Sequence, residues 1–133
     1  MAGKPRMGEA GVRHALVGGW SQRKGRFTGL LLGIRQGKRR KLTYIGEAPT
    51  SSDDLLVRFL EERLREAEIE TSPFLGDVPE RPNLTHHWIS PELVAELAFE
   101  GWTKGHLRSP SLQSVTERSS FRRPHWIEMP AKA

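Results

Sequence analysis

The chain has 133 residues, no cysteine and a formal net charge of +5 at pH 7. This length allows one domain with a modest core, and the lack of cysteine excludes a disulfide framework and thiolate chemistry. No apolar run of about 18 residues occurs, and the N-terminus lacks the apolar core of a signal peptide. We therefore expect a cytoplasmic chain without a membrane partner. The net positive charge fits a polyanionic partner such as nucleic acid, although positive charge alone is a weak indication.

The first elements are a flexible lead, a strand and a basic loop. Residues 1–11 are rich in glycine, lysine and arginine, which predicts a flexible N-terminal lead. The first predicted strand covers residues 12–20 and is expected to end at the Gly18-Gly19 pair. The following loop, residues 21–26, carries Lys24 and Arg26. These cations are suited to contacts with phosphates, but they are equally consistent with a solvated hairpin loop.

The strongest strand signal covers residues 27–35, an apolar run with Gly29 and Gly33 inside it. Glycines within a strand often mark the bulges or bends that close a small barrel. A turn at Gln36-Gly37 and a partner strand over residues 41–46 follow. Five basic side chains surround this turn, namely Arg35, Lys38, Arg39, Arg40 and Lys41. Such a density of like charge favours a phosphate-facing surface over a solvated loop.

A helix is predicted after residues 48–54. Ser51 or Ser52 is suited to its N-cap, with Asp53 and Asp54 in the first turn, where acidic charge complements the helix dipole. Apolar residues recur at helical spacing on one face, which predicts packing against a core: Leu55, Leu56, Phe59, Leu60 and Leu64. The charged residues between positions 61 and 66 are expected to form a solvated face without a chemical role.

The segment around residues 88–99 permits two interpretations. Helix propensity is high, and Ser90 could cap a helix, but apolar residues also alternate with period 2 as in a strand. We expect a strand, which the family resemblance below favours, with Trp88 and Trp102 in the core more often than stacked on bases. His86-His87 lacks the spacing of a metal site, so we expect an ordinary solvated or hydrogen-bonded pair and no bound metal.

The last elements are a hairpin and a polar C-terminal part. Residues 101–107 are predicted to turn at Lys104-Gly105, residues 108–118 to form a polar exit, and residues 119–133 a loosely ordered tail. Phe121 and Trp126 are the tail residues that could pack back on the domain. The whole pattern predicts a mainly β domain over residues 12–118. It resembles a five-stranded OB-fold Greek-key barrel with one helix between strands 3 and 4.

Seven short motifs, in this order, resemble the C-terminal OB-fold domain of bacterial ATP-dependent DNA ligases of the ligase D type. They are Leu16-Val-Gly-Gly-Trp20, Gly29-Leu-Leu-Leu-Gly33, Leu42-Thr-Tyr-Ile-Gly46, Thr71-Ser-Pro-Phe74, Trp88-Ile-Ser-Pro-Glu-Leu-Val-Ala-Glu-Leu-Ala-Phe99, Trp102-Thr103 and Leu107-Arg-Ser-Pro-Ser111. Any one of them is a weak signal, but together they extend over roughly residues 14–115 and indicate homology.

The resemblance implies a division of labour. In that family a separate nucleotidyltransferase domain carries a Lys-x-Asp-Gly motif whose lysine takes AMP. The OB domain contacts the backbone of the nicked duplex, and its last motif, near Arg-x-Asp-Lys, faces the ATP pyrophosphate. This chain has no Lys-x-Asp-Gly and is too short to hold that domain. It is therefore expected not to be catalytic alone, and ATP and Mg are implied only for the complete ligase.

The sequence departs from the family pattern at both ends. The family's Gly-Leu-Arg-x-Asp-Lys corresponds to Ser114-Val-Thr-Glu-Arg-Ser119, so Thr116, Arg118 and Ser119 replace the arginine, aspartate and lysine. Arg118 is a tentative replacement for the nucleotide-phosphate contact. The lysine-rich motif that ends the preceding domain would fall near residues 4–8, where only Lys4 and Arg6 are basic. Fold and DNA affinity therefore transfer more safely than a part in adenylation.

The leading hypothesis is a DNA-binding OB domain of a bacterial, nucleoid-associated ligase for DNA repair and end joining, working with an adenylation domain in trans or one lost upstream. Backbone contacts are assigned to Lys24, Arg26, Arg35, Lys38, Arg39, Arg40, Lys41, Lys104 and Arg108, and Trp20 is a candidate for base stacking. The alternative is a stand-alone, non-enzymatic OB module that binds single-stranded nucleic acid. A truncated product without activity is a third interpretation.

Overall fold

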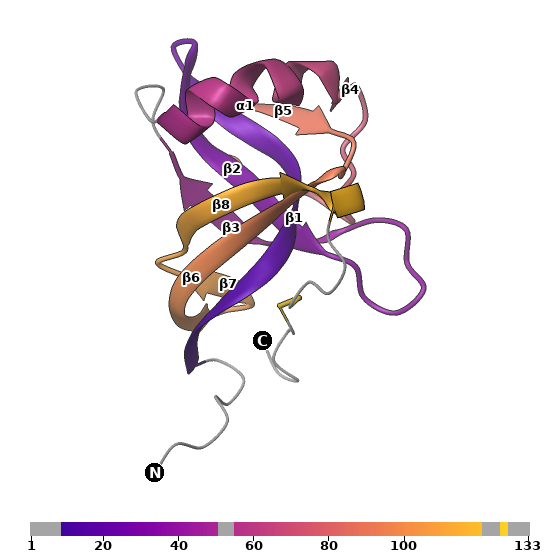
Figure 1. Ribbon diagram of the computed structural model, residues 1–133, viewed down its shortest axis with the longest axis vertical. Helices are drawn as coiled ribbons and strands as arrows, with labels where there is room; N and C mark the ends of the chain where they lie inside the picture. Colours follow the sequence, from indigo (N-terminus) through magenta and orange to yellow (C-terminus); the bar gives the residue numbers. More distant parts are fainter. Residues whose placement is uncertain (1–8, 51–54, 121–125, 128–133) are drawn as a thin grey trace.

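A computed structural model describes residues 9–50, 55–120 and 126–127, and these residues form eight strands, one α-helix and one 3-10 turn (Figure 1). The elements are β1 (Glu9–Arg23), β2 (Arg26–Ile34), β3 (Thr43–Pro49), α1 (Leu55–Glu66), β4 (Glu68–Ile69), β5 (Thr85–Ile89), β6 (Leu93–Thr103), β7 (His106–Arg108), β8 (Ser111–Glu117) and η1 (Arg118–Ser120). Among the described residues, no helix is long and apolar enough to cross a membrane.

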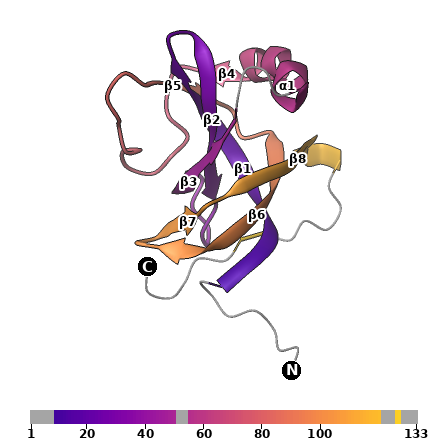
Figure 2. The ribbon, with the colours of Figure 1, turned by 90° about the vertical axis from the view of Figure 1, so that its left-hand side faces the viewer.

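The long strand β1 organises the sheet. Its first half pairs antiparallel with β6, from Glu9 to Leu16, and its second half pairs with β5, from Gly19 to Gln22. On its other edge β1 pairs with β2, which in turn pairs with β3. Figure 2 shows the strong curvature that this change of partner produces. One strand thus joins the two parts of the sheet.

The mainly β, OB-type architecture with a helix after the third strand is confirmed, but two details of the prediction are wrong. The sheet has eight strands where five were predicted, and it is open. β3 lies beside β7, where the Tyr44 and His106 rings are 5.0 Å apart, yet β7 pairs only with β6 among the described strands. The extra strands are mostly short, such as β4 and β7, so their sequences carry little periodic signal.

Strand β8 corrects the prediction of a polar exit over residues 108–118. Its residues pair with β6 from Leu93↔Glu117 to Ala98↔Ser111. The strand interpretation of residues 93–103 is confirmed by β6, whose alternate side chains Leu93, Ala95, Leu97 and Phe99 enter the main core. β1 begins at Glu9, three residues before the predicted strand, while residues 1–8 lie outside the described part.

The helix and the C-terminal residues also contribute to the core. Leu64 of α1 is buried and Leu60 packs against the core, but Leu55 is 76% exposed, so its assignment to the apolar face is wrong. Ile127 is 3% exposed, and its N–H donates to the His14 carbonyl at 2.9 Å. The predicted N-cap at residues 51–54, the side chains of Leu56 and Phe59, and Phe121 fall outside the described parts of the structure.

Two glycines allow the close packing where β1 changes partner. A Cβ on Gly18 would lie 2.5 Å from Cζ of Phe74, and one on Gly19 would overlap the backbone carbonyl oxygen of His87. These positions require glycine because a neighbouring ring and a neighbouring strand occupy the space of a side chain. The Gly18-Gly19 pair is thus a requirement of tertiary packing and does not end the strand.

We expect Gly19→Ala to lower the free energy of unfolding by about 1–3 kcal/mol, because the added methyl group must displace backbone. Gly11→Ala in the same strand is the matched control, since its Cβ would have 3.7 Å to the nearest atom, a ring carbon of Phe99. Urea unfolding followed by circular dichroism measures both variants. Equal stability of Gly19→Ala and the wild type would contradict this packing.

Candidate nucleic-acid interface

The cationic segment between β2 and β3, residues 35–41, is here called the basic loop. All seven of its residues are exposed. Its shape is held from within, because Nε of Arg35 donates to the Arg40 carbonyl at 3.2 Å and the Arg39 N–H donates to the Gln36 carbonyl at 3.2 Å. These internal hydrogen bonds satisfy backbone carbonyls and leave the ends of the lysine and arginine side chains directed to solvent.

The end of the basic loop is fixed to the core at Leu42. This residue is fully buried, its N–H donates to the Pro73 carbonyl at 2.8 Å, and its carbonyl accepts from the Leu75 N–H at 2.7 Å. The segment around Phe74 therefore acts as a short partner for the loop exit. Residues 70–82 are irregular over most of their length, but Phe74 within them belongs to the core.

The two lysine-glycine turns project lysines from the tips of two hairpins. Lys24-Gly25 has φ values of 52° and 78°, and Lys104-Gly105 has 50° and 81°. Two successive positive φ angles are typical of type I′ hairpin turns, which match the twist of the flanking strands. Both lysines are exposed. The predicted hairpin at Lys104-Gly105 is confirmed by the pairing of Thr103 with His106.

The structure divides the predicted cations into two groups. Lys104 lies in the β6–β7 hairpin, whose His106 contacts Tyr44 at the start of β3, and Arg108 follows in β7, where its Nη2 donates to the Glu100 carbonyl at 3.1 Å. Lys24 and Arg26 lie at the start of β2, whereas the basic loop follows its end. The length of β2 separates the two groups by about 25 Å, at 3.3 Å per residue. Figure 1 shows this separation, with the β1–β2 turn at the top and the basic loop at the lower right.

Arg118 meets Arg35 at the edge of the basic loop. Both line a hollow of about 170 Å³ with Leu16, Ile34, Trp126 and Ile127. Partial burial lowers the pKa of Arg35, and the positive charge of Arg118 lowers it further. Within the described ranges, neither arginine forms an ion pair with a carboxylate. The fold thus brings together a residue of the predicted backbone surface and the tentative nucleotide-phosphate residue.

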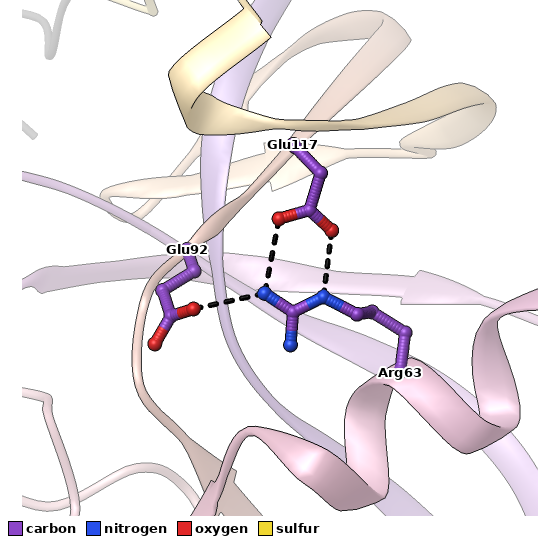
Figure 3. A network of polar contacts seen from close by, with 3 residues as sticks. All are labelled: Arg63, Glu92 and Glu117. Atoms are coloured by element: carbon purple, nitrogen blue, oxygen red, sulfur yellow. Dashed lines mark hydrogen bonds and ion pairs between the residues drawn. The ribbon is translucent and has the colours of Figure 1, made fainter.

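A polar network holds the segment that carries Arg118 (Figure 3). The guanidinium of Arg63 on α1 binds Glu117 through two hydrogen bonds of 2.6 and 3.0 Å, and it binds Glu92 at 2.8 Å. The Glu92 carbonyl accepts from the Arg118 N–H at 2.8 Å. The expectation that Arg63 belongs to a solvated face is therefore wrong, because its bidentate contact ties the helix to the end of β8.

Trp20 is a core residue, which corrects its candidacy for base stacking. Its side chain is 2% exposed and stacks on His87, with ring centroids 4.7 Å apart. His87 is hydrogen-bonded as expected, through Nε2 to Gln22 at 2.9 Å and through Nδ1 to Glu68 at 3.1 Å. Trp88 and Trp102 are partly buried against the core. Trp126, which lines the hollow, is 38% exposed and is the most exposed tryptophan among the described residues.

Comparisons with known proteins agree with this geometry. The family model of the ATP dependent DNA ligase C terminal region matches residues 23–129. The ligase domain of M. tuberculosis LigD superposes with a TM-score of 0.69 at 25% identity, over 86% of this chain and 39% of that one. A mycobacterial DNA ligase D complexed with ATP and MES gives 0.65 at 28% identity, over 86% and 38%. No curated protein matches the sequence.

The Arg63 network makes a prediction about pH. Hydrogen bonding from Arg63, and then from Ser90, holds the pKa of Glu92 below its ordinary value of 4.5. Its contribution to stability is thus complete above that ordinary value and is lost as the pH falls through the lowered one. In Arg63→Met the Glu92 pKa should rise towards the ordinary value, as measured by NMR titration.

Arg65→Met is the matched control, since Arg65 lies on the same helix and pairs with Glu61, at 3.1 Å, and not with Glu92. It should leave the Glu92 pKa unchanged. An identical Glu92 titration in the wild type and in Arg63→Met would show that the network does not form in solution.

Proposed function

We propose the following function for this chain, which belongs to the family of ATP-dependent DNA ligase C-terminal regions. It serves as a DNA-binding OB domain that engages the duplex backbone around a nick and assists a nucleotidyltransferase domain. The observation that carries this proposal is the basic loop, where five exposed cations lie on one segment that is anchored to the core. Its biological setting is DNA repair by end joining.

The arrangement of cations supports contact with a phosphate backbone. The residues of the basic loop, Lys104 and Arg108 are all exposed, and lysine and arginine are the residues that neutralise phosphates without reading sequence. Lys24 and Arg26 also contact the phosphate backbone only if the duplex runs along β2. A separation of about 25 Å corresponds to roughly 7 base pairs at 3.4 Å per pair, so one short duplex spans both groups.

The assistance to ligation is positional and electrostatic. This chain contains no Lys-x-Asp-Gly motif, so the adenylated lysine belongs to another domain. ATP and Mg belong to the complete ligase, and Arg118 is the residue of the last motif that can face a nucleotide phosphate here. Ser119 offers no charge at the position of the family's lysine. The domain contributes by clamping and orienting the duplex.

The single-strand module remains the competing function, and the burial of Trp20 weighs against it. Proteins that bind single strands without sequence preference present aromatic faces on which bases stack. Trp20 is enclosed by Phe27 and His87 and offers no such face. With Trp20 buried, the exposed cations carry more of the expected binding than base stacking does, and this fits a duplex better than a single strand.

Fluorescence anisotropy on nicked duplex, intact duplex and single strand, each at two salt concentrations, tests the proposal. Combined replacement of Lys38, Arg39 and Arg40 by alanine should weaken duplex binding equally for all sequences. It should reduce the slope of log K against log salt by up to about 2.7, because each phosphate contact contributes roughly 0.9. The control is Arg58→Ala with Arg65→Ala, which removes exposed charges from α1 at the other end of the molecule.

The outcomes separate the alternatives. A steep salt slope with preference for nicked or intact duplex supports the ligase clamp. Preference for single strand favours the independent module. An unchanged slope in the triple variant removes the basic loop from the interface, and no binding to any of the three nucleic acids contradicts the proposed function.

A further inference from the structure

The hollow between Arg35 and Arg118 has the features of an anion site. Its floor is apolar, from Leu16, Ile34 and Ile127, and the two arginines and the Trp126 indole complete its wall. Nε of Arg35 donates to the Arg40 carbonyl, which orients the guanidinium and leaves its terminal amino groups available to a ligand. Two guanidinium groups thus border one small hollow.

The electrostatics of the hollow favour an anion with more than one negative charge. Arg35 and Arg118 repel each other, and the pKa of Arg35 is lowered first by partial burial and then by this repulsion. A group bound between them removes the repulsion, and planar guanidinium groups bind phosphate oxygens in a bidentate manner. Arg118 also borders a second hollow, of about 400 Å³, but Glu92 and Glu117 line that one, and the single charge of Arg63 does not offset both carboxylates.

The size of the hollow selects a phosphate group over a whole nucleotide. Its volume of about 170 Å³ lies below the range of roughly 300–1,000 Å³ in which pockets enclose small organic ligands. A phosphodiester within a strand carries one charge and has a sugar on both sides, so it cannot be inserted into a small hollow as a chain terminus can. A terminal phosphate monoester has one ester link and about −1.5 to −2 charge at pH 7.

We propose that Arg35 and Arg118 bind the terminal phosphate of a DNA end in this hollow, with Trp126 placed against the adjoining nucleotide. This inference rests on the proposed function and deepens it, because it names the feature of DNA that the domain distinguishes. The basic loop begins at Arg35 and holds the strand that leads away from the end. Strand ends and nicks that carry a phosphate are then bound in preference to those that carry a hydroxyl.

The test uses hairpin DNA with one open end, which carries a 5′-phosphate, a 3′-phosphate or only hydroxyl groups. Anisotropy should show the wild type binding one phosphorylated end about tenfold more tightly than the hydroxyl end, as expected for charge-assisted hydrogen bonds. Arg118→Ala and Arg35→Ala should each abolish this preference. Arg118→Lys should retain only part of it, because lysine keeps the charge and loses the planar fork.

Two controls separate this site from general charge effects. Arg58→Ala removes one exposed arginine from α1 and should keep the full preference for the phosphorylated end. The alanine triple variant at Lys38, Arg39 and Arg40 should bind both DNAs more weakly while their ratio persists. Thermal unfolding of every variant confirms that the fold is intact.

Each contrary result has a distinct meaning. Equal binding of phosphorylated and hydroxyl ends overturns the end-recognition site and leaves the proposed DNA binding standing, whereas no binding of either DNA overturns both. A preference that survives Arg35→Ala and Arg118→Ala places recognition elsewhere and rejects the site. If adenosine monophosphate competes as strongly as the phosphorylated end, the ligand is a free nucleotide and the assignment to DNA ends is wrong.

Discussion

The packing of one aromatic ring against two glycines is the contact on which the rest of the structure depends. Phe74 is 2% exposed, and a Cβ would lie 2.5 Å from its ring at Gly18 and 2.8 Å from it at Gly33. Because both strands lack a side chain there, the ring lies directly on the backbones of β1 and β2. The flanking residues Pro73 and Leu75 hydrogen-bond to Leu42. The same contact therefore fixes the sheet and the exit of the basic loop.

A rigid anchor matters because the basic loop is electrostatically unfavourable by itself. Like charges on neighbouring residues repel within the Debye length of about 8 Å at physiological salt, and the repulsion opposes a compact loop. The buried Leu42 and the hydrogen bond from Arg35 to the Arg40 carbonyl hold the charges together despite it. The core thus provides stability that the loop lacks.

Local periodicity predicted those parts of the fold that bury one regular face. The alternation in β6 and the helical spacing of Leu60 and Leu64 are of this kind. β8 escaped prediction because a register shift opposite Glu96 and Leu97 breaks its alternation. Trp20 and Arg63 required tertiary information, since Arg63 binds partners 29 and 54 residues away. Charge density identified the basic loop, but no local pattern could show that Arg35 meets Arg118.

The altered last motif has a consistent physical explanation in this structure. The family pattern of arginine, aspartate and lysine and the present Thr116, Arg118 and Ser119 both sum to one positive charge. What changes is the carboxylate, which is absent from these three positions, so Arg118 faces Arg35 without an acid of the motif between them. The neighbouring Glu117 is neutralised by Arg63. The hollow between Arg35 and Arg118 is lined by two cations and no carboxylate, which suits a bound anion better than an internal ion pair.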